Sequence, residues 1–211
     1  MYFIYLRIIL FIFLIVCGFY RIQRTKENWV WAFPLWGVLD LSTLVLDEYV
    51  FSSNLELFLI YYLILTMPLT YLYYKVGELK INTLFPFTIV PIIVIVVFIF
   101  DLIPTSRDLY SDYGCLNVKE YMLSVAVVCI IHVLYVLYII FNCLKIHLFE
   151  LYKLIILFGL AIYFIGFSLF HIVEFYYIDN MKGYLNLGEY FIPLQVIISK
   201  GLIMIGLLWK E

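Results

Sequence analysis

The chain has 211 residues, of which 66% are hydrophobic and only 13% charged, with a formal net charge of −2 and a mean hydropathy of +1.08. A soluble domain carries about a quarter charged residues, so this composition leaves too little polar surface for a water-soluble globule. It also excludes a disordered chain, a secreted disulfide scaffold and a nucleic-acid-binding protein. We therefore expect an integral membrane protein whose main partner is the lipid bilayer.

Seven apolar stretches are each long enough, at about 20 residues, to cross a hydrocarbon core as a helix. Their apolar runs are continuous, whereas β-barrel strands alternate apolar and polar residues. The first stretch lacks a basic start and a small-residue cleavage site, so we interpret it as a helix and not as a signal peptide. We predict an all-α, polytopic seven-transmembrane-helix bundle forming a single domain over residues 1–211, with spans at 2–20, 29–46, 55–74, 83–103, 119–144, 151–174 and 187–208.

Charges in the short loops predict the orientation of this bundle, because Lys and Arg are retained on the cytoplasmic side. One side carries most of the basic residues, namely Arg21, Arg24, Lys26, Lys75, Lys80, Lys145, Lys153 and Lys210. The opposite side carries only Arg107, Lys119 and Lys182, together with most of the acidic residues. We therefore expect the N-terminus outside and the C-terminus in the cytoplasm, with the protein in the cell (inner) membrane.

Ionisable residues inside the spans are the main candidates for a functional site, because each costs several kcal/mol in hydrocarbon unless it is paired or hydrated. Arg7 and Asp40 lie roughly 8 and 9 Å below the outer ends of the first two spans, at about 1.5 Å per residue. These matching depths favour an ion pair. Three interpretations of these two residues remain open: the pair only holds the two helices together, Arg7 snorkels outward, or both residues take part in ligand binding.

Lys200 lies deeper, about 20 Å from the outer end and about 12 Å from the inner end of the last span. At that depth its amine must meet a carboxylate, a polar cavity or a ligand, or lose its proton. The alternative is a structural lysine that donates hydrogen bonds to backbone carbonyls. Candidate neighbours at similar depth are Thr66 and His132, with Tyr62 one turn nearer the outside.

His171 and Glu174 lie three residues apart on one face of the sixth span, near its outer end. With Arg7 and Asp40 they complete a predicted polar vestibule that opens to the outside. A metal ion would need further ligands from other helices, and the cysteines have no zinc-site spacing, so we expect no metal and no cofactor. No catalytic signature is present, and an enzyme is not expected, although an intramembrane hydrolase using these two residues stays open.

Two short motifs resemble known membrane families. Leu65-Thr-Met-Pro-Leu69 resembles the Thr-Thr-Pro-Leu motif of microbial rhodopsins, which implies a retinal Schiff base on Lys200. Tyr62 and Val196, however, stand where that family carries carboxylates. The segment from Lys26 to Gly37 resembles the start of the second helix in the nicotinamide-riboside uptake family and implies a small carrier.

A third resemblance covers more of the chain. The stretches Phe158-Gly-Leu-Ala-Ile-Tyr-Phe164 and Ile197-Ile-Ser-Lys-Gly-Leu-Ile-Met-Ile-Gly206, preceded by Asn54 and Tyr61, are similar to small seven-helix proteins of Bacteroidota. This resemblance implies the fold and an inner-membrane location but no activity.

Two functions are compatible with this sequence. In the first, the bundle is receptor-like: it binds a small ligand or protons and signals through a partner membrane or cytoplasmic protein. In the second, it is a secondary transporter of a small solute or ion, with alternating access around Lys200. A site that is closed on the cytoplasmic side favours the receptor, and a water-filled path to both faces favours the transporter.

Overall fold

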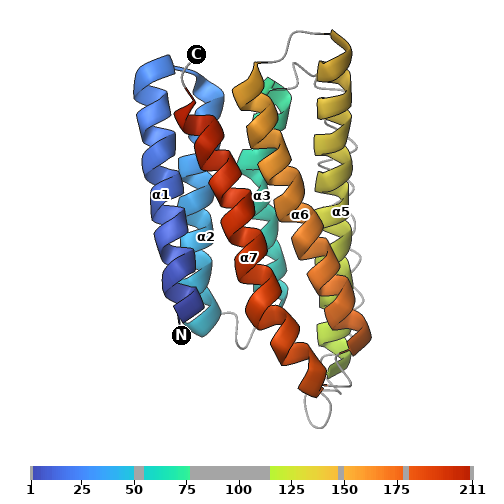
Figure 1. The fold of residues 1–211 in the computed structure, drawn as a ribbon. Coiled ribbons are helices and arrows are strands. Elements are labelled where there is room, and N and C mark those ends of the chain that lie inside the picture. Colours follow the sequence, from blue (N-terminus) through green and yellow to red (C-terminus); the bar gives the residue numbers. More distant parts are fainter. Residues whose placement is uncertain (1, 50–54, 77–114, 147–149, 178–180, 210–211) are drawn as a thin grey trace.

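The computed structural model describes residues 2–49, 55–76, 115–146, 150–177 and 181–209. Within these residues every regular element is a helix (Figure 1). The elements are α1 (Tyr2–Thr25), the short 3₁₀ helix η1 (Asn28–Trp31), α2 (Ala32–Tyr49), α3 (Leu55–Val76), α5 (Cys115–Ile146), α6 (Leu151–Tyr177) and α7 (Met181–Leu208).

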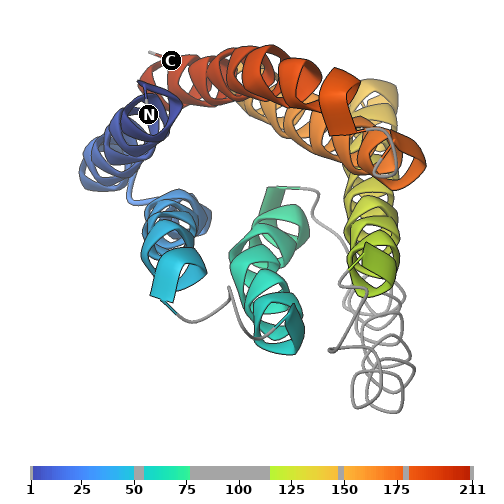
Figure 2. The same ribbon diagram turned by 90° about the horizontal axis from the view of Figure 1, so that it is seen from below.

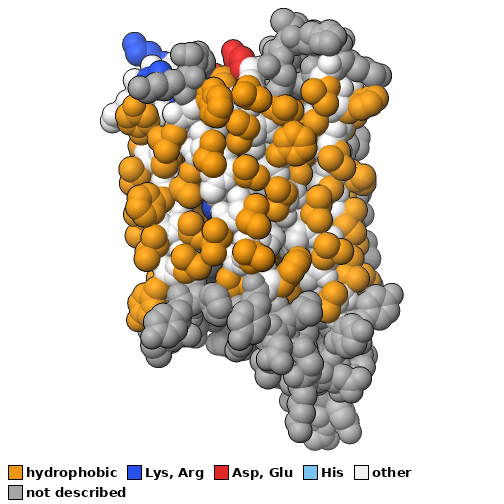
Figure 3. Space-filling model, viewed as in Figure 1, with side chains coloured by type: hydrophobic (Ala, Val, Ile, Leu, Met, Phe, Trp, Pro, Cys, Tyr) orange, Lys and Arg blue, Asp and Glu red, His pale blue; other side chains and the backbone are white. Residues whose placement is uncertain are grey.

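Four of the described helices are long and apolar enough to cross a membrane. The stretches are Ile8–Thr25 in α1, Val125–Asn142 in α5, Leu151–Val173 in α6 and Phe191–Leu208 in α7. Among the described residues, hydrophobic side chains cover the face that α1, α7, α6 and α5 present in Figure 3, and the charged side chains visible on it gather mainly near the end that holds the C-terminus. These features fit a multi-pass membrane protein. The predicted span 83–103 lies outside the described residues.

Helix α1 continues beyond its predicted end at residue 20. The Thr25 hydroxyl donates a hydrogen bond to the Arg21 carbonyl (3.0 Å), and the Lys26 amide donates to the Ile22 carbonyl (3.0 Å). Lys26 then adopts a positive φ of 55°, which ends the helix. Arg21, which the sequence analysis assigned to a loop, therefore lies on the last turns of α1, and its side chain is buried.

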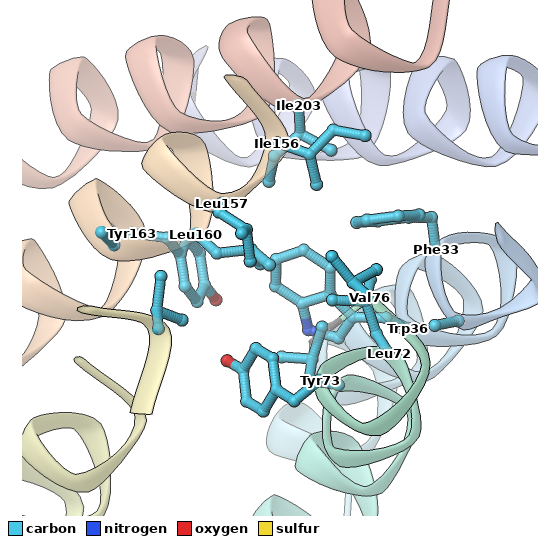
Figure 4. Close-up of a cluster of buried hydrophobic side chains, with 14 of the residues drawn as sticks. Phe33, Trp36, Leu72, Tyr73, Val76, Ile156, Leu157, Leu160, Tyr163 and Ile203 are labelled. Carbon is cyan, nitrogen blue, oxygen red and sulfur yellow. The ribbon is translucent and has the colours of Figure 1, made fainter. Parts of the chain in front are cut away.

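The six described α-helices form a ring. Each helix contacts the next in the order α1, α2, α3, α5, α6 and α7, and α7 returns to contact α1. Viewed end-on in Figure 2, α1, α7 and α6 lie along one side, and α2 and α3 lie opposite them. The core is rich in aromatic side chains, and Figure 4 shows Trp36, Tyr73 and Tyr163 within this buried cluster.

Glycines allow α6 and α7 to pack at very short range. A Cβ atom added to Gly159 would lie 2.8 Å from the Ser199 carbonyl oxygen, and one added to Gly206 would lie 2.8 Å from the Tyr152 carbonyl oxygen. Because both obstacles are backbone atoms, no side-chain rotation can relieve such a clash. Close backbone approach through small residues is a usual way of joining membrane helices. It makes α6 and α7 one tightly packed pair.

Helices α1 and α2 form a second pair of this kind. A Cβ atom at Gly18 would lie 2.6 Å from the Pro34 ring, and one at Gly37 would lie 2.7 Å from the Ile15 side chain. The proline ring is rigid, so the first contact leaves little room for adjustment. The ring of helices thus contains two glycine-packed pairs, α1–α2 and α6–α7, which meet where α1 contacts α7.

Candidate functional site

Lys200 lies in the middle of the apolar stretch of α7, nine residues after Phe191 and eight before Leu208. Its side chain has no solvent-exposed surface. The ammonium nitrogen Nζ lies 3.0 Å from the centroid of the Trp36 ring, 4.2 Å from that of Phe11 and 4.4 Å from that of Tyr163. We call these four residues the Lys200 cage.

The three rings of the cage support one another edge to face. The centroids of Trp36 and Tyr163 are 5.1 Å apart with planes at 89°, and those of Phe11 and Trp36 are 6.3 Å apart with planes at 88°. Ring faces carry the negative end of the aromatic quadrupole, so each attracts an ammonium placed above it. The attraction amounts to about 2 kcal/mol or more where water is excluded. Aromatic faces are thus direct neighbours of this buried cation.

The cage connects the two glycine-packed pairs. Phe11 lies on α1 and Trp36 on α2, whereas Tyr163 lies on α6 and Lys200 on α7. The ammonium is therefore held by side chains from both pairs at once.

Asp40 is the one buried acid among the described residues, with 2% of its surface exposed. It follows Trp36 by four residues on α2, which places it on the same face of the helix one turn further along. The predicted ion pair with Arg7 stays a prediction, because the structure describes the backbone of Arg7 but not its side chain.

His132 belongs to a neighbouring buried cluster on the other side of Tyr163. Its ring stacks on Phe164, with centroids 4.5 Å apart and planes at 10°. Its Nδ1 atom shares a hydrogen bond with the Tyr73 hydroxyl at 3.3 Å, and the Tyr73 ring lies 5.0 Å from that of Tyr135. Since the rings of Tyr163 and Phe164 are 5.3 Å apart, a continuous row of aromatic contacts joins this cluster to the Lys200 cage.

The remaining predicted site residues are only partly described. His171 is half-buried on α6, with its ring 5.4 Å from that of Phe170 and 6.2 Å from that of Phe167. The structure describes the backbone of Glu174, Tyr62 and Thr66 but not their side chains, so their predicted roles stay predictions.

A second buried cation, which the sequence analysis missed as a site, lies at the end of the bundle near the C-terminus. Arg21 is 1% exposed, and its guanidinium lies 4.2 Å above the Tyr152 ring. One terminal nitrogen donates a hydrogen bond to the Trp209 carbonyl (2.8 Å), and the other lies 3.4 Å from a Glu27 carboxylate oxygen. A cation beside the carbonyl that follows α7 also complements the negative end of the helix dipole.

Glu27 completes this group. Its Oε1 atom accepts hydrogen bonds from the Tyr152 hydroxyl (2.9 Å) and from the Trp29 indole (3.2 Å). We call Arg21, Glu27, Tyr152 and Trp209 the Arg21 cluster. Arg21 and Glu27 come from α1 and the segment after it, and Tyr152 and Trp209 from α6 and the end of α7. Like the Lys200 cage, the Arg21 cluster joins the two glycine-packed pairs.

The sequence does contain a signal for the buried Arg21. Phe11, Leu14, Gly18 and Arg21 follow one another at spacings of three and four residues, which places all of them on one face of a helix. The first three are buried against the bundle, so the same face predicts burial of the fourth. Assigning the basic residues after position 20 to a loop concealed this periodicity.

A polar cavity of about 320 Å³ lies beside the Arg21 cluster and is lined by Arg21, Arg24, Thr25, Glu27 and Glu150. Glu150 lies at its edge and forms an ion pair with Lys153 at 2.7 Å. The hydrogen bond from Lys153 is the main cause that lowers the pKa of the Glu150 carboxyl, aided by a hydrogen bond from Tyr152.

Comparisons with protein-family models, with curated proteins and with solved structures find no match to this chain. Among the residues that the structure describes, no group of three or more His, Cys, Asp or Glu side chains could hold a metal ion.

Proposed function

We propose that this protein is a receptor-like sensor in the cell inner membrane, a seven-helix bundle with its N-terminus outside and its C-terminus in the cytoplasm. In this proposal the Lys200 cage responds to protons or to a small anionic ligand. The response passes to a partner protein at the cytoplasmic end. The observation that carries the proposal is the fully buried ammonium held by three aromatic rings across the boundary of two packed helix pairs.

The cage can respond because ring faces attract only the charged form of the amine. Loss of the proton removes the attraction, and an anion entering beside Lys200 draws the ammonium away from the rings. In both cases the contact between α7 and the α1–α2 pair weakens. Packed interfaces of this kind have discrete arrangements and do not deform continuously, so a local change is converted into a shift of one pair against the other.

Helix α7 provides the connection to the cytoplasmic end. Lys200 and Trp209 are nine residues apart, about 14 Å along the helix axis. The Trp209 carbonyl is held by Arg21 on α1, so a shift of α7 that starts at the cage strains this hydrogen bond. The Arg21 cluster lies at the end that carries most of the basic loop residues, which by the loop-charge rule is the cytoplasmic one.

A receptor accounts for the closed site better than a transporter does. A transporter must open its site to each face in turn. One feature that favours a transporter is Pro193 inside α7, because interrupted helices often flank transport sites. The Gln195 amide, however, donates a 2.6 Å hydrogen bond to the Tyr163 carbonyl and ties this part of α7 to α6.

The test uses tryptophan fluorescence of the purified protein in lipid nanodiscs. We expect the emission of the wild type to change with pH or on addition of small carboxylates or phosphate, because the ammonium lies 3.0 Å from the Trp36 ring centroid. The Lys200→Met variant loses this response. Lys75→Met is the matched control, since Lys75 is an exposed lysine 5.2 Å above the Tyr74 ring, and it keeps the response.

Other outcomes decide against the sensor. An unchanged response in Lys200→Met, or no response in the wild type, refutes it. Dissipation of a pH gradient across liposomes that depends on Lys200 supports the transporter instead. A visible absorption band that forms with added retinal and disappears in Lys200→Met supports the retinal-binding alternative.

The proposed orientation has its own test. Cys115 begins α5 at the end that we place outside, and Cys143 follows near the other end of the same helix. A membrane-impermeant thiol reagent is therefore expected to label Cys115 and not Cys143 on intact cells. Labelling of Cys115 only after the membrane is permeabilised reverses the orientation.

A further inference from the structure

An apolar groove of about 500 Å³ lies between α2 and α3. Its walls are formed by Trp31, Ala32, Leu35 and Leu39 on one side and by Ile64, Met67, Pro68 and Tyr71 on the other. Leu35 and Met67, near the middle of the groove, are 53% and 60% exposed, so the groove is open to the outside of the bundle there. Figure 2 shows α2 and α3 on the side of the ring opposite α6 and α7.

The two ends of this groove differ in chemistry. Trp31 and Tyr71 are amphipathic rings, of the kind that anchors at the membrane–water interface. Lys75 follows Tyr71 by four residues on α3, so it lies on the same face beyond the groove. The opposite end, at Leu39 and Ile64, is aliphatic and lies about 10 to 12 Å further along the two helices.

We propose that this groove binds one acyl chain of an anionic phospholipid whose phosphate lies beside Lys75. An apolar groove with an aromatic rim suits the upper part of a hydrocarbon chain that enters from the interface. A basic residue at the mouth attracts a negatively charged headgroup. The positive charge of Lys75 favours anionic over zwitterionic lipids, and the groove holds the acyl chain in a fixed position. This inference is independent of what the Lys200 cage senses.

The test measures quenching of Trp31 fluorescence by phospholipids with brominated acyl chains. The Trp31 signal is obtained as the difference between the wild type and the Trp31→Phe variant. At equal mole fractions we expect brominated phosphatidylglycerol to occupy the groove about fivefold more than brominated phosphatidylcholine, the effect of one lysine at an anionic surface. Lys75→Gln removes this preference. Arg24→Gln, which removes an exposed positive charge on α1, leaves it unchanged.

A second variant tests the groove itself. Met67→Phe places a larger side chain at its open edge and is expected to reduce Trp31 quenching by both lipids. Equal quenching of the wild type by the two lipids overturns the proposal and shows ordinary contact with bulk lipid. Protection of Trp31 from both lipids also overturns it. In that case a dimeric hydrodynamic mass identifies a second copy as the occupant, and a monomeric mass identifies another part of this chain.

Discussion

Arg21→Met removes the cation of the Arg21 cluster while keeping an unbranched side chain above the Tyr152 ring. The substitution abolishes the hydrogen bond to the Trp209 carbonyl and leaves the Glu27 carboxylate without its ion pair. A hydrogen bond from a charged group contributes about 1.5 to 3 kcal/mol, and Glu27 keeps its bonds from Tyr152 and Trp29. We therefore expect a loss of about 3 kcal/mol in the free energy of unfolding.

The assay is thermal unfolding of the purified protein in detergent. For a chain of this size, about 3 kcal/mol corresponds to a fall in Tm of roughly 6 to 12 °C. Arg24→Met is the matched control, because it removes the same charge from the same helix at an exposed position, and we expect a change below about 2 °C. Adding Glu27→Gln to Arg21→Met relieves the uncompensated carboxylate, so the double variant loses less than the two single effects added together. Equal falls in Tm for Arg21→Met and Arg24→Met refute the buried cluster.

Two further predictions concern helix packing and pH. Gly159→Ala should lower the Tm because the added Cβ meets the backbone of α7. Gly201→Ala, with open space around the added Cβ, should leave the Tm unchanged or raise it slightly. The reverse order of Tm values in thermal melts contradicts the close packing of α6 against α7. The lowered pKa of Glu150 stabilises the folded state above its ordinary value of 4.5, and this contribution is lost as the pH falls through the folded pKa. Because Glu150 is about half exposed, the effect is small. A pH series of melts should show a larger effect in the wild type than in Lys153→Met, where the ion pair is absent and only the weaker causes, such as the Tyr152 hydrogen bond, remain.

The sequence predicts helix positions in this protein far better than helix ends. The predicted span 151–174 lies within α6, Leu151–Tyr177, because long continuous apolar runs are distinctive. The length of an apolar run, however, reflects the thickness of the hydrocarbon core, whereas a helix continues until its backbone conformation changes. For α1 that change occurs at Lys26 and not at Arg21, where the apolar run ends. The predicted seven helices and their orientation depend on span 83–103 and on loop charges, and they remain part of the proposal.

The candidate site, like the helices, could be predicted from the sequence only in part. Lys200 can be selected from the sequence because a single charge within an apolar stretch is conspicuous. Its neighbours Phe11 and Trp36 cannot be selected in this way, because 20% of the chain is aromatic and nothing in the composition distinguishes the rings that contact a cation. Which rings meet depends on the rotation of three helices and on which helices are adjacent. The sequence points to Thr66 and His132 by depth alone, whereas the structure places His132 against Tyr73 and Phe164.

An aromatic cage is suited to a switch because its attraction is moderate. Breaking a buried ion pair costs about 3 to 5 kcal/mol, whereas a desolvated cation–π contact contributes about 2 kcal/mol, or roughly a thirtyfold change in an equilibrium. Trp attracts a cation more strongly than Phe, so Trp36→Phe should weaken the cage slightly and Trp36→Leu more strongly, while Phe11 and Tyr163 keep their contacts with the ammonium. Amide hydrogen exchange in the last turn of α7 should then rise in the order wild type, Trp36→Phe, Trp36→Leu. Exchange that is the same in Trp36→Leu and the wild type would show that the cage does not control the α7 end, and the connection from Lys200 to the Arg21 cluster would be wrong.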